Sequence, residues 1–295
     1  MAPGSYRQKR KSTKVTKALL ITTWLLIVLL LGFGFLFISK EIQKQSEDNS
    51  QFIGDPSAPS VYNKNALVIL TDSTGQDLMK FILINFNDQQ SKISVAALPD
   101  TMETTVKYKN GSLREQFEYG GPLQVRAAVE NALSISVDKH IVCPLGALEQ
   151  TVENLGGVEY TLQEELYYKD SSGAVLTDLK KGTQTLNGQQ VVKFLRYPKW
   201  GDDAESANEC AKLFNAAINQ YATEDTAKKI PQLFSDVVNQ LNTDVSVMDI
   251  LELQEKYSVF VNAKTPAKVI SVSGTKDRGF KASEDTLKNL KEAFK

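Results

Sequence analysis

Few residues of this chain could carry thiol, imidazole or metal chemistry. It has two cysteines, Cys143 and Cys210, and one histidine, His140, and their spacing matches no Cys/His zinc site. An even cysteine count leaves a disulfide open if the domain is extracellular. We favour two buried free thiols, because Cys210 falls on the apolar stripe of a predicted helix, where cysteine behaves as a small hydrophobic residue. His140 lies in a short apolar segment and is expected to be a strand residue rather than a ligand.

The charged residues are divided unevenly along the chain. The net charge is −1, and residues 1–17 carry six lysines and arginines and no acid, which leaves −7 for residues 18–295. An acidic folded part has no basic stripe that could neutralise many phosphates, so nucleic acid is disfavoured as a partner. The apolar fraction of 42% is ordinary for a globular protein and predicts a real hydrophobic core.

Residues 18–38 form an uncharged, mostly apolar run. As a helix this run would span about 31 Å, which matches the hydrocarbon core of a bilayer. We expect residues 18–39 to form a retained transmembrane helix rather than a cleaved signal peptide, because the run is long and no small-x-small cleavage site follows it. The basic residues before it predict a cytoplasmic tail at 1–17, a single pass through the cell membrane and an extracellular C-terminal domain.

The composition changes again after the apolar run. Residues 40–62 are rich in polar residues, serine and proline, and are expected to form an extracellular stalk. Residues 63–295 mix short apolar runs with longer amphipathic segments, which predicts one α/β domain around a central sheet. We expect strands at 66–70, 80–86 and 92–98, helices that open at Gly121-Pro122 and Pro144, and further helices at 203–221, 230–241, 247–256 and 283–294.

Three segments between about residues 64 and 222 carry short motifs in a fixed order. The first joins Leu70-Thr-Asp-Ser-Thr-Gly-Gln-Asp77 to Leu98-Pro-Asp-Thr101. The second contains Tyr119-Gly-Gly121, Asp138-Lys-His-Ile-Val142 and Leu155-Gly-Gly-Val-Glu159, and the third joins Leu186-Asn-Gly-Gln-Gln190 to Phe194-Leu-Arg-Tyr197. In order and spacing these motifs resemble the LytR-CpsA-Psr family of bacterial envelope proteins. The combination is specific, whereas any one motif alone is weak.

The resemblance implies a fold, a reaction and a set of site residues. Family members move a glycan polymer from a polyprenyl-pyrophosphate carrier onto peptidoglycan, usually with a divalent cation such as Mg²⁺. The implied fold is a central mixed sheet flanked by helices, with an apolar tunnel for the lipid. By motif position, Asp72, Asp77 and Asp100 are candidates for holding the cation, and Arg196 and, in a region of weaker resemblance, Arg114 are candidates for binding phosphate. Carboxylate oxygens suit hard cations, and guanidinium groups bind phosphate in a forked geometry.

Each candidate also has a simpler explanation. Asp72 could cap the turn after a strand, Asp77 could be a solvated loop acid, and Asp100 could be a turn residue. Arg196 could pair with an acid such as Asp202 rather than with phosphate.

The chain departs from the family pattern chiefly at arginine positions. The departures are Thr74 in the first motif, Pro99 followed directly by Asp100, Pro198 after Arg196-Tyr197, and Ser206 and Glu209 on the helix that should carry two arginines. Several lost bidentate contacts would cost about 2–5 kcal/mol each in a desolvated site. Lys107, Lys109 and Lys199 are candidate replacements, although lysine is a point charge and not a fork.

These departures leave two functions to compare. We favour a degenerate, membrane-anchored member of the family that binds a polyprenyl-phosphate-linked glycan, peptidoglycan or a partner without efficient catalysis and needs no metal. The alternative is an active phosphotransferase with a rearranged site and Mg²⁺, which predicts that Asp72, Asp77, Asp100 and Arg196 meet in one pocket. A third reading, an unrelated anchored domain, predicts no central sheet with Asp72 and Arg196 at one end.

Overall fold

The structure is a computed structural model that describes residues 61–72 and 79–295. The predicted tail at 1–17, the predicted transmembrane helix at 18–39, nearly all of the predicted stalk and Asp77 lie outside these residues. Within the described residues, no helix combines the length and the apolar character that crossing a bilayer requires.

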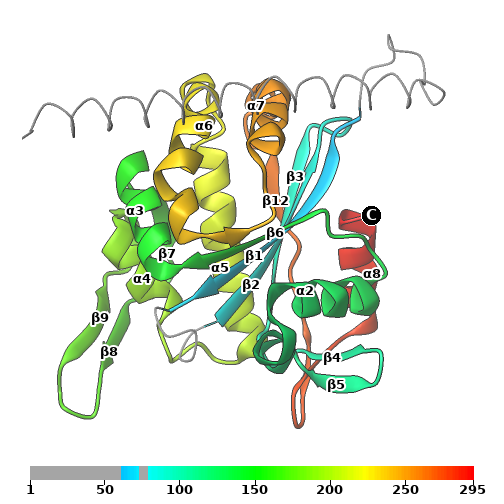
Figure 1. The fold of residues 1–295 in the computed structure, drawn as a ribbon. Coiled ribbons are helices and arrows are strands. Elements are labelled where there is room, and N and C mark those ends of the chain that lie inside the picture. Colours follow the sequence, from blue (N-terminus) through cyan, green and yellow to red (C-terminus); the bar gives the residue numbers. More distant parts are fainter. Residues whose placement is uncertain (1–60, 73–78) are drawn as a thin grey trace, which may run out of the picture. The chain divides into compact units, whose positions relative to one another are not determined.

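Six strands form one mixed sheet, in the order β11-β6-β1-β2-β3-β12 (Figure 1). Its centre is an antiparallel trio of β1 (Asn63–Thr71), β2 (Met79–Asn87) and β3 (Lys92–Leu98). The outer strands are β6 (Lys139–Pro144) parallel to β1, β12 (Ala267–Val269) parallel to β3, and β11 (Asn242–Thr243) antiparallel to β6. The prediction of a central mixed sheet is confirmed.

The central strands form because their sequences are continuous apolar runs. Phe81, Ile82 and Leu83 are all fully buried, so β2 is covered on both faces. The strands predicted at 66–70, 80–86 and 92–98 are confirmed as the cores of β1, β2 and β3.

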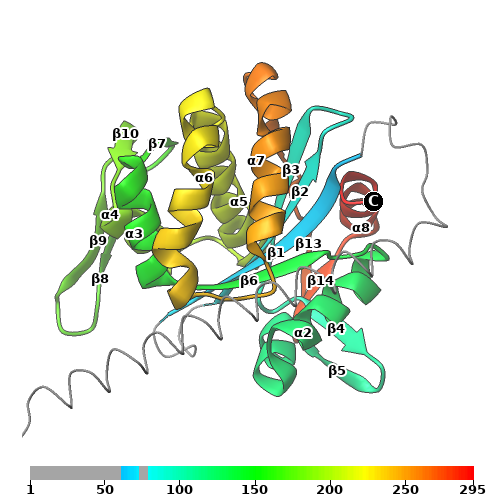
Figure 2. The same cartoon turned by 45° about the horizontal axis from the view of Figure 1, so that its top comes forward.

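Helices cover both faces of this sheet (Figures 1 and 2). On one side lie α3 (Leu145–Leu155), α4 (Gly188–Leu195), α5 (Asp203–Gln220), α6 (Glu224–Val237), the short 3₁₀ turn η2 (Val238–Gln240) and α7 (Val247–Asn262). On the other side lie α2 (Leu113–Leu133), α8 (Glu284–Ala293) and the hairpin of β4 (Glu103–Val106) and β5 (Lys109–Ser112).

Three further strand pairs lie outside the central sheet. They are β7 (Val158–Leu162) with β10 (Gly182–Leu186), β8 (Leu166–Lys169) with β9 (Val175–Leu179), and β13 (Gly274–Lys276) with β14 (Phe280–Ala282). The pair β13–β14 lies beside the start of β4, because Phe280 of β14 forms a bridge with Met102.

Several predicted helix boundaries were wrong. The helix expected to open at Gly121-Pro122 begins at Leu113, where Ser112 and Glu115 form a capping box. Gly120 and Gly121 leave helical geometry, with φ of −147° and 65°, so Pro122 opens only the second half of α2. In addition, α6 begins at Glu224 rather than near residue 230, and α7 continues to Asn262.

Both cysteines are free thiols, so the disulfide alternative is wrong. Cys143 lies on β6 and Cys210 is buried on α5, as its place on the apolar stripe predicted. Burial raises the pKa of the Cys210 thiol to about 12. His140 is a buried residue of β6, as expected.

Candidate functional site

A pocket of about 500 Å³ lies where the end of β3, the starts of β2, α2 and α5, the end of α4 and β13 meet. Its basic side chains are Lys80, Arg114, Arg196 and Lys276, and its acidic ones are Asp100, Asp202 and Asp203. We call it the basic pocket. Of the predicted site residues, the structure brings Asp100, Arg114 and Arg196 together here.

Asp100 and Arg114 form a forked pair on one wall of the pocket. Arg114 donates from Nε and Nη2 to Oδ2 of Asp100, at 3.0 and 2.8 Å. The backbone N–H of Arg114 also donates to the carbonyl of Asp100, at 3.0 Å. Asp100 is therefore a partner of the arginine as well as a turn residue after β3, and it holds the guanidinium at the pocket.

Asp203 joins three segments at the first turn of α5. Its carboxylate accepts from Thr101 Oγ1 and, at 2.9 Å, from Lys276 Nζ on β13. Burial alone would raise the pKa of this carboxyl, but the hydrogen bonds from Thr101 and Lys276 outweigh it and hold the pKa below its usual range. Asp203 therefore stays ionised at neutral pH.

Lys80 brings a positive charge to the helix position that the family resemblance expects to be arginine. Its Nζ donates to Ser206 Oγ at 2.7 Å. Glu209, the second altered position, accepts from Tyr160 Oη at 3.0 Å and from Lys212 Nζ at 2.6 Å. It is not among the described residues that line the basic pocket, so its charge is partly neutralised away from the site.

Arg196 is the exposed C-cap residue of α4. Its expected alternative partner, Asp202, instead caps α5 by accepting from the N–H of Glu205 at 2.8 Å. Among the described residues, no carboxylate is paired with the Arg196 guanidinium. It is thus the arginine of the pocket that a ligand can reach without displacing a carboxylate.

The structure does not bring the candidate cation ligands Asp72 and Asp100 together in the described lining of the basic pocket. Asp72 is buried directly after β1 and is not among the described residues that line the basic pocket, and its expected companion Asp77 is outside the described part. No group of three acids, cysteines or histidines with metal-binding geometry exists in that part either. Asp100 already accepts two hydrogen bonds from Arg114, which makes it a poor ligand for a hard cation.

Sequence reasoning missed Lys80, Lys276 and Asp203. The lysines proposed as replacements lie elsewhere: Lys109 stands over the Tyr119 ring at 4.7 Å, and Lys199 over the Tyr168 ring at 5.5 Å. Lys80 begins a predicted strand, but only the order of strands in the sheet brings it to Ser206. Lys276 belongs to a three-residue strand that gives no periodic signal.

Comparison with known proteins shows to which family this chain belongs. The model of the LytR_cpsA_psr family matches residues 43–295. This chain belongs to the LytR_cpsA_psr family. The match begins after the apolar run and covers all of the described domain.

The curated relatives are distant and longer. The chain is 22% identical over 215 residues to the polyisoprenyl-teichoic acid–peptidoglycan teichoic acid transferase TagV of Bacillus subtilis (strain 168), covering 72% of this chain and 52% of TagV. It is 23% identical to the transferase TagT of the same organism, covering 58% of this chain and 54% of TagT. The chain thus spans about half the length of these family members.

Solved structures of low identity share the fold. A putative transcription regulator from Eubacterium siraeum superposes with a TM-score of 0.71 at 18% identity, over 83% of this chain and 95% of that one. TagT bound to LI-WTA superposes with a TM-score of 0.63 at 20% identity, over 82% and 92%. These structures share the mixed α/β fold described above.

Proposed function

We propose that this family member binds the pyrophosphate of a polyprenyl-linked glycan in the basic pocket and transfers the glycan inefficiently. The observation that carries the proposal is the gathering of Lys80, Arg114, Arg196 and Lys276 from four elements around one pocket. Guanidinium and ammonium groups are the usual protein partners of phosphate. Relatives named as teichoic acid transferases agree with a lipid-linked phosphate as ligand.

The site can accept phosphate by exchanging partners. Arg196 has no carboxylate to displace, and the Lys80 ammonium is held by the neutral hydroxyl of Ser206. Arg114 and Lys276 are held by carboxylates that are partly exposed. An ion pair with such exposure is worth about 0–1 kcal/mol, so a multiply charged phosphate can compete with it.

The same carboxylates argue against efficient transfer. Among the described residues, the pocket lining has four basic and three acidic side chains, a net charge of only about one positive unit. Phosphoryl transfer depends on charges fixed in advance around the leaving oxygens. Here Asp100, Asp202 and Asp203 would stand beside that developing charge and repel it.

We also propose a location for this site. Residues 18–39 would anchor the chain as a single-pass helix, with 1–17 in the cytoplasm, 40–62 as a stalk and 63–295 outside the cell. Polyprenyl-linked glycan and peptidoglycan would then lie on the same side of the membrane as the basic pocket.

The second candidate function is active transfer of a glycan polymer from polyprenyl pyrophosphate to peptidoglycan. It is favoured by one observation, that Lys80 stands beside Ser206 and so restores a charge at an altered position. This function would need a divalent cation, held by Asp72 with residues outside the described part.

Binding and turnover separate the two candidates. We expect the purified full-length chain to bind farnesyl pyrophosphate in buffer with EDTA, and Arg196→Ala to raise the Kd about tenfold, or ~1.4 kcal/mol. Lys199→Ala is the matched control, since it removes an exposed cation three residues away that faces Tyr168. Unchanged binding by Arg196→Ala would reject the proposed site.

Turnover is measured with the same protein and Mg²⁺. Inefficient transfer predicts that phosphate release from a polyprenyl-pyrophosphate analogue is no faster for the wild type than for Asp72→Ala. Mg²⁺-dependent release that disappears in Asp72→Ala would establish the active alternative instead.

A further inference from the structure

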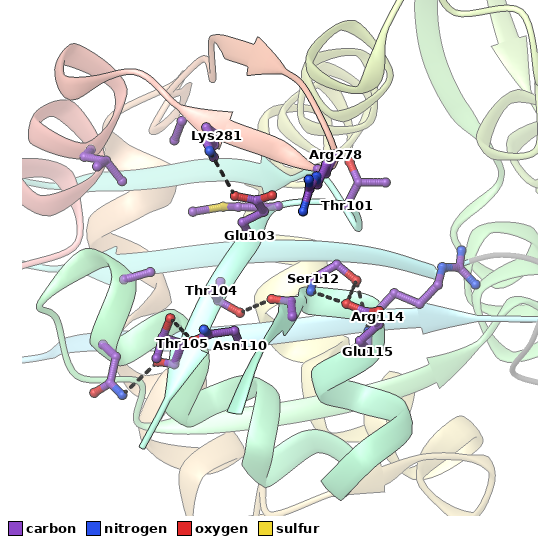
Figure 3. Close-up of a pocket in the computed structure, with 17 residues that line it drawn as sticks. Thr101, Glu103, Thr104, Thr105, Asn110, Ser112, Arg114, Glu115, Arg278 and Lys281 are labelled. Carbon is purple, nitrogen blue, oxygen red and sulfur yellow. Dashed lines mark hydrogen bonds and ion pairs between the residues drawn. The ribbon is translucent and has the colours of Figure 1, made fainter. Parts of the chain in front are cut away.

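A second cavity, of about 1360 Å³, lies between the β4–β5 hairpin, both ends of α2 and the β13–β14 hairpin with α8 (Figure 3). We call it the polar groove. It adjoins the basic pocket, because Arg114 lines both. The hairpin of β13 and β14 also lines both cavities, because Lys276 lines the basic pocket and Arg278 lines the groove.

The groove lining combines neutral polar, charged and apolar residues. The neutral polar residues are Thr101, Thr104, Thr105, Asn110, Ser112 and Asn131. Apolar atoms contribute at least as much of the groove surface as polar atoms, and its apolar side chains are Met102, Ala132, Ala282 and Leu287. The hydroxyls and amides match the hydroxyl groups of a sugar, which are donors and acceptors at once, and the apolar surface between them matches its C–H faces.

Two groups on opposite walls are available to a ligand. On the β5 wall, Asn110 Oδ1 accepts from Thr105 Oγ1 at 2.9 Å, which leaves its amide N–H₂ as donor. On the β13–β14 wall stands Arg278, labelled beside Thr101 in Figure 3. Among the described residues, neither the Asn110 amide nitrogen nor the Arg278 guanidinium has a protein acceptor. By contrast, Glu115 is committed to the Ser112 cap and Lys281 to Glu103.

The walls of the groove are fixed before a ligand arrives. Phe280 N–H donates to the carbonyl of Thr101 at 2.9 Å, and Met102 bridges to Phe280. Gly279 packs so closely that a Cβ there would lie 2.9 Å from that carbonyl. The hydroxyl of Thr104 donates to Gly111 O at 3.0 Å and stiffens the hairpin opposite. A preformed groove binds without an ordering cost.

We propose that the polar groove binds a saccharide chain, with Asn110 and Arg278 donating from opposite walls and Arg114 at the end that adjoins the basic pocket. Its volume exceeds the ~300–1,000 Å³ of ordinary small-molecule sites, which favours several sugar units over one. The placement beside the basic pocket rests on the proposed function. The saccharide is then either the glycan attached to the pyrophosphate or a glycan strand of peptidoglycan.

The experiment uses three fluorescent probes and the full-length chain. One probe is farnesyl pyrophosphate without sugar, the second is farnesyl pyrophosphate carrying a disaccharide, and the third is a phosphate-free oligomer of the peptidoglycan glycan strand. Binding is measured for the wild type, Arg278→Ala and Asn110→Ala. Lys291→Ala, which removes an exposed cation of α8 outside the groove, is the matched control.

We expect both groove variants to leave farnesyl pyrophosphate binding unchanged and to raise the Kd of a sugar-bearing probe about tenfold, as expected for the loss of a well-placed hydrogen bond. Weakening of the disaccharide probe alone identifies the groove as the site for the attached glycan. Weakening of the glycan-strand oligomer identifies it as the site for peptidoglycan. The melting temperature of each variant checks that it folds.

Two results would overturn the inference: no sugar-dependent binding by the wild type, or sugar-dependent binding that neither variant changes. Failure of the proposed function looks different, because it appears as farnesyl pyrophosphate binding that Arg196→Ala leaves intact. The experiment can therefore reject saccharide binding in the groove while it supports pyrophosphate binding in the basic pocket, or the reverse.

Discussion

Three of the four cations of the basic pocket are held by protein acceptors before a ligand arrives. Asp100 holds Arg114, Asp203 holds Lys276 and Ser206 holds Lys80. Such contacts keep the cations in position, yet they also compete with phosphate. The affinity for phosphate therefore depends on the difference between the hydrogen bonds that the cations form with phosphate and those that they form with protein acceptors. Replacing a single carboxylate should change this affinity.

Replacing Asp100 by asparagine should tighten binding of farnesyl pyrophosphate. The change removes one negative charge from the pocket and weakens the contact of residue 100 with the Arg114 guanidinium, so we expect the Kd to fall by about three- to tenfold. Asp225→Asn is the control, because it breaks an ion pair with Lys229 on the exposed surface of α6. Weaker binding by Asp100→Asn would instead make Asp100 a ligand in its own right.

The stability that Asp203 contributes should depend on pH. Because the folded pKa of this carboxyl lies below its unfolded value near 3.8, the contribution is present above that unfolded value and is lost as the pH falls through the folded pKa. At pH 7 we expect the free energy of unfolding of Asp203→Asn to be about 1–3 kcal/mol lower than that of the wild type. The gap, measured by urea unfolding at several pH values, should close below about pH 4. An equal gap at pH 3 and pH 7 would show that the ionised carboxylate is not responsible.

At the scale of elements, the hairpin β13–β14 does more for the site than its length suggests. It carries Lys276 into one cavity and Arg278 into the other, and it is held against β4 by the contact of Phe280 with Thr101. Gly279 packs so closely against Thr101 and Glu103 that a single added methyl group should disturb the packing of the hairpin.

A methyl group at Gly279 should therefore disturb both cavities. A Cβ would meet Glu103 Cγ at 2.7 Å and the Thr101 carbonyl at 2.9 Å, so we expect Gly279→Ala to cost about 1–3 kcal/mol and to weaken pyrophosphate and saccharide binding together. The matched variant is Gly146→Ala on α3, where a Cβ meets nothing within 4 Å and helix propensity improves. Thermal unfolding and the probe assays measure both effects. A stable Gly279→Ala variant with normal binding would show that the hairpin does not position Lys276 and Arg278.

The sequence predicted those elements whose local signals agree with their surroundings. The apolar runs predicted β1, β2 and β3, and the start predicted at residue 247 is the start of α7, where Ser246 and Asp249 form a capping box. The start of α2 was missed because the Gly-Gly-Pro sequence outweighed the Ser112–Glu115 box. Strands of three residues, such as β13, have no period to detect.

The candidate site was predictable only where a motif marked it. Asp100, Arg114 and Arg196 could be chosen because they lie in or near the family motifs. Lys80, Asp203 and Lys276 meet only through the order of strands in the sheet and the long return of the chain after β12. Counting arginines along the sequence therefore underestimated the positive charge of the pocket, since lysines from distant elements fill part of the same space.

At the scale of the whole molecule, function depends on which side of the membrane the domain occupies. The family match starts at residue 43, five residues after the apolar run of 18–38 ends. Six basic residues precede that run, and the described linings of the basic pocket and the polar groove consist of residues of the domain. The proposed location is thus independent of the chemistry proposed for the pocket and can be tested separately.

Protease shaving of protoplasts tests this location. The full-length chain would be expressed in a bacterium with an epitope tag at each end, and intact protoplasts would be treated with trypsin. We expect the C-terminal tag to be lost, because Lys40 and Lys44 lie in the polar segment after the apolar run, while the N-terminal tag stays protected until the membrane is permeabilised. Deleting residues 18–38 should move the protein from the membrane fraction to the soluble fraction. A C-terminal tag that trypsin reaches only after permeabilisation would place the domain in the cytoplasm, where neither peptidoglycan nor a translocated lipid-linked glycan could reach its two cavities.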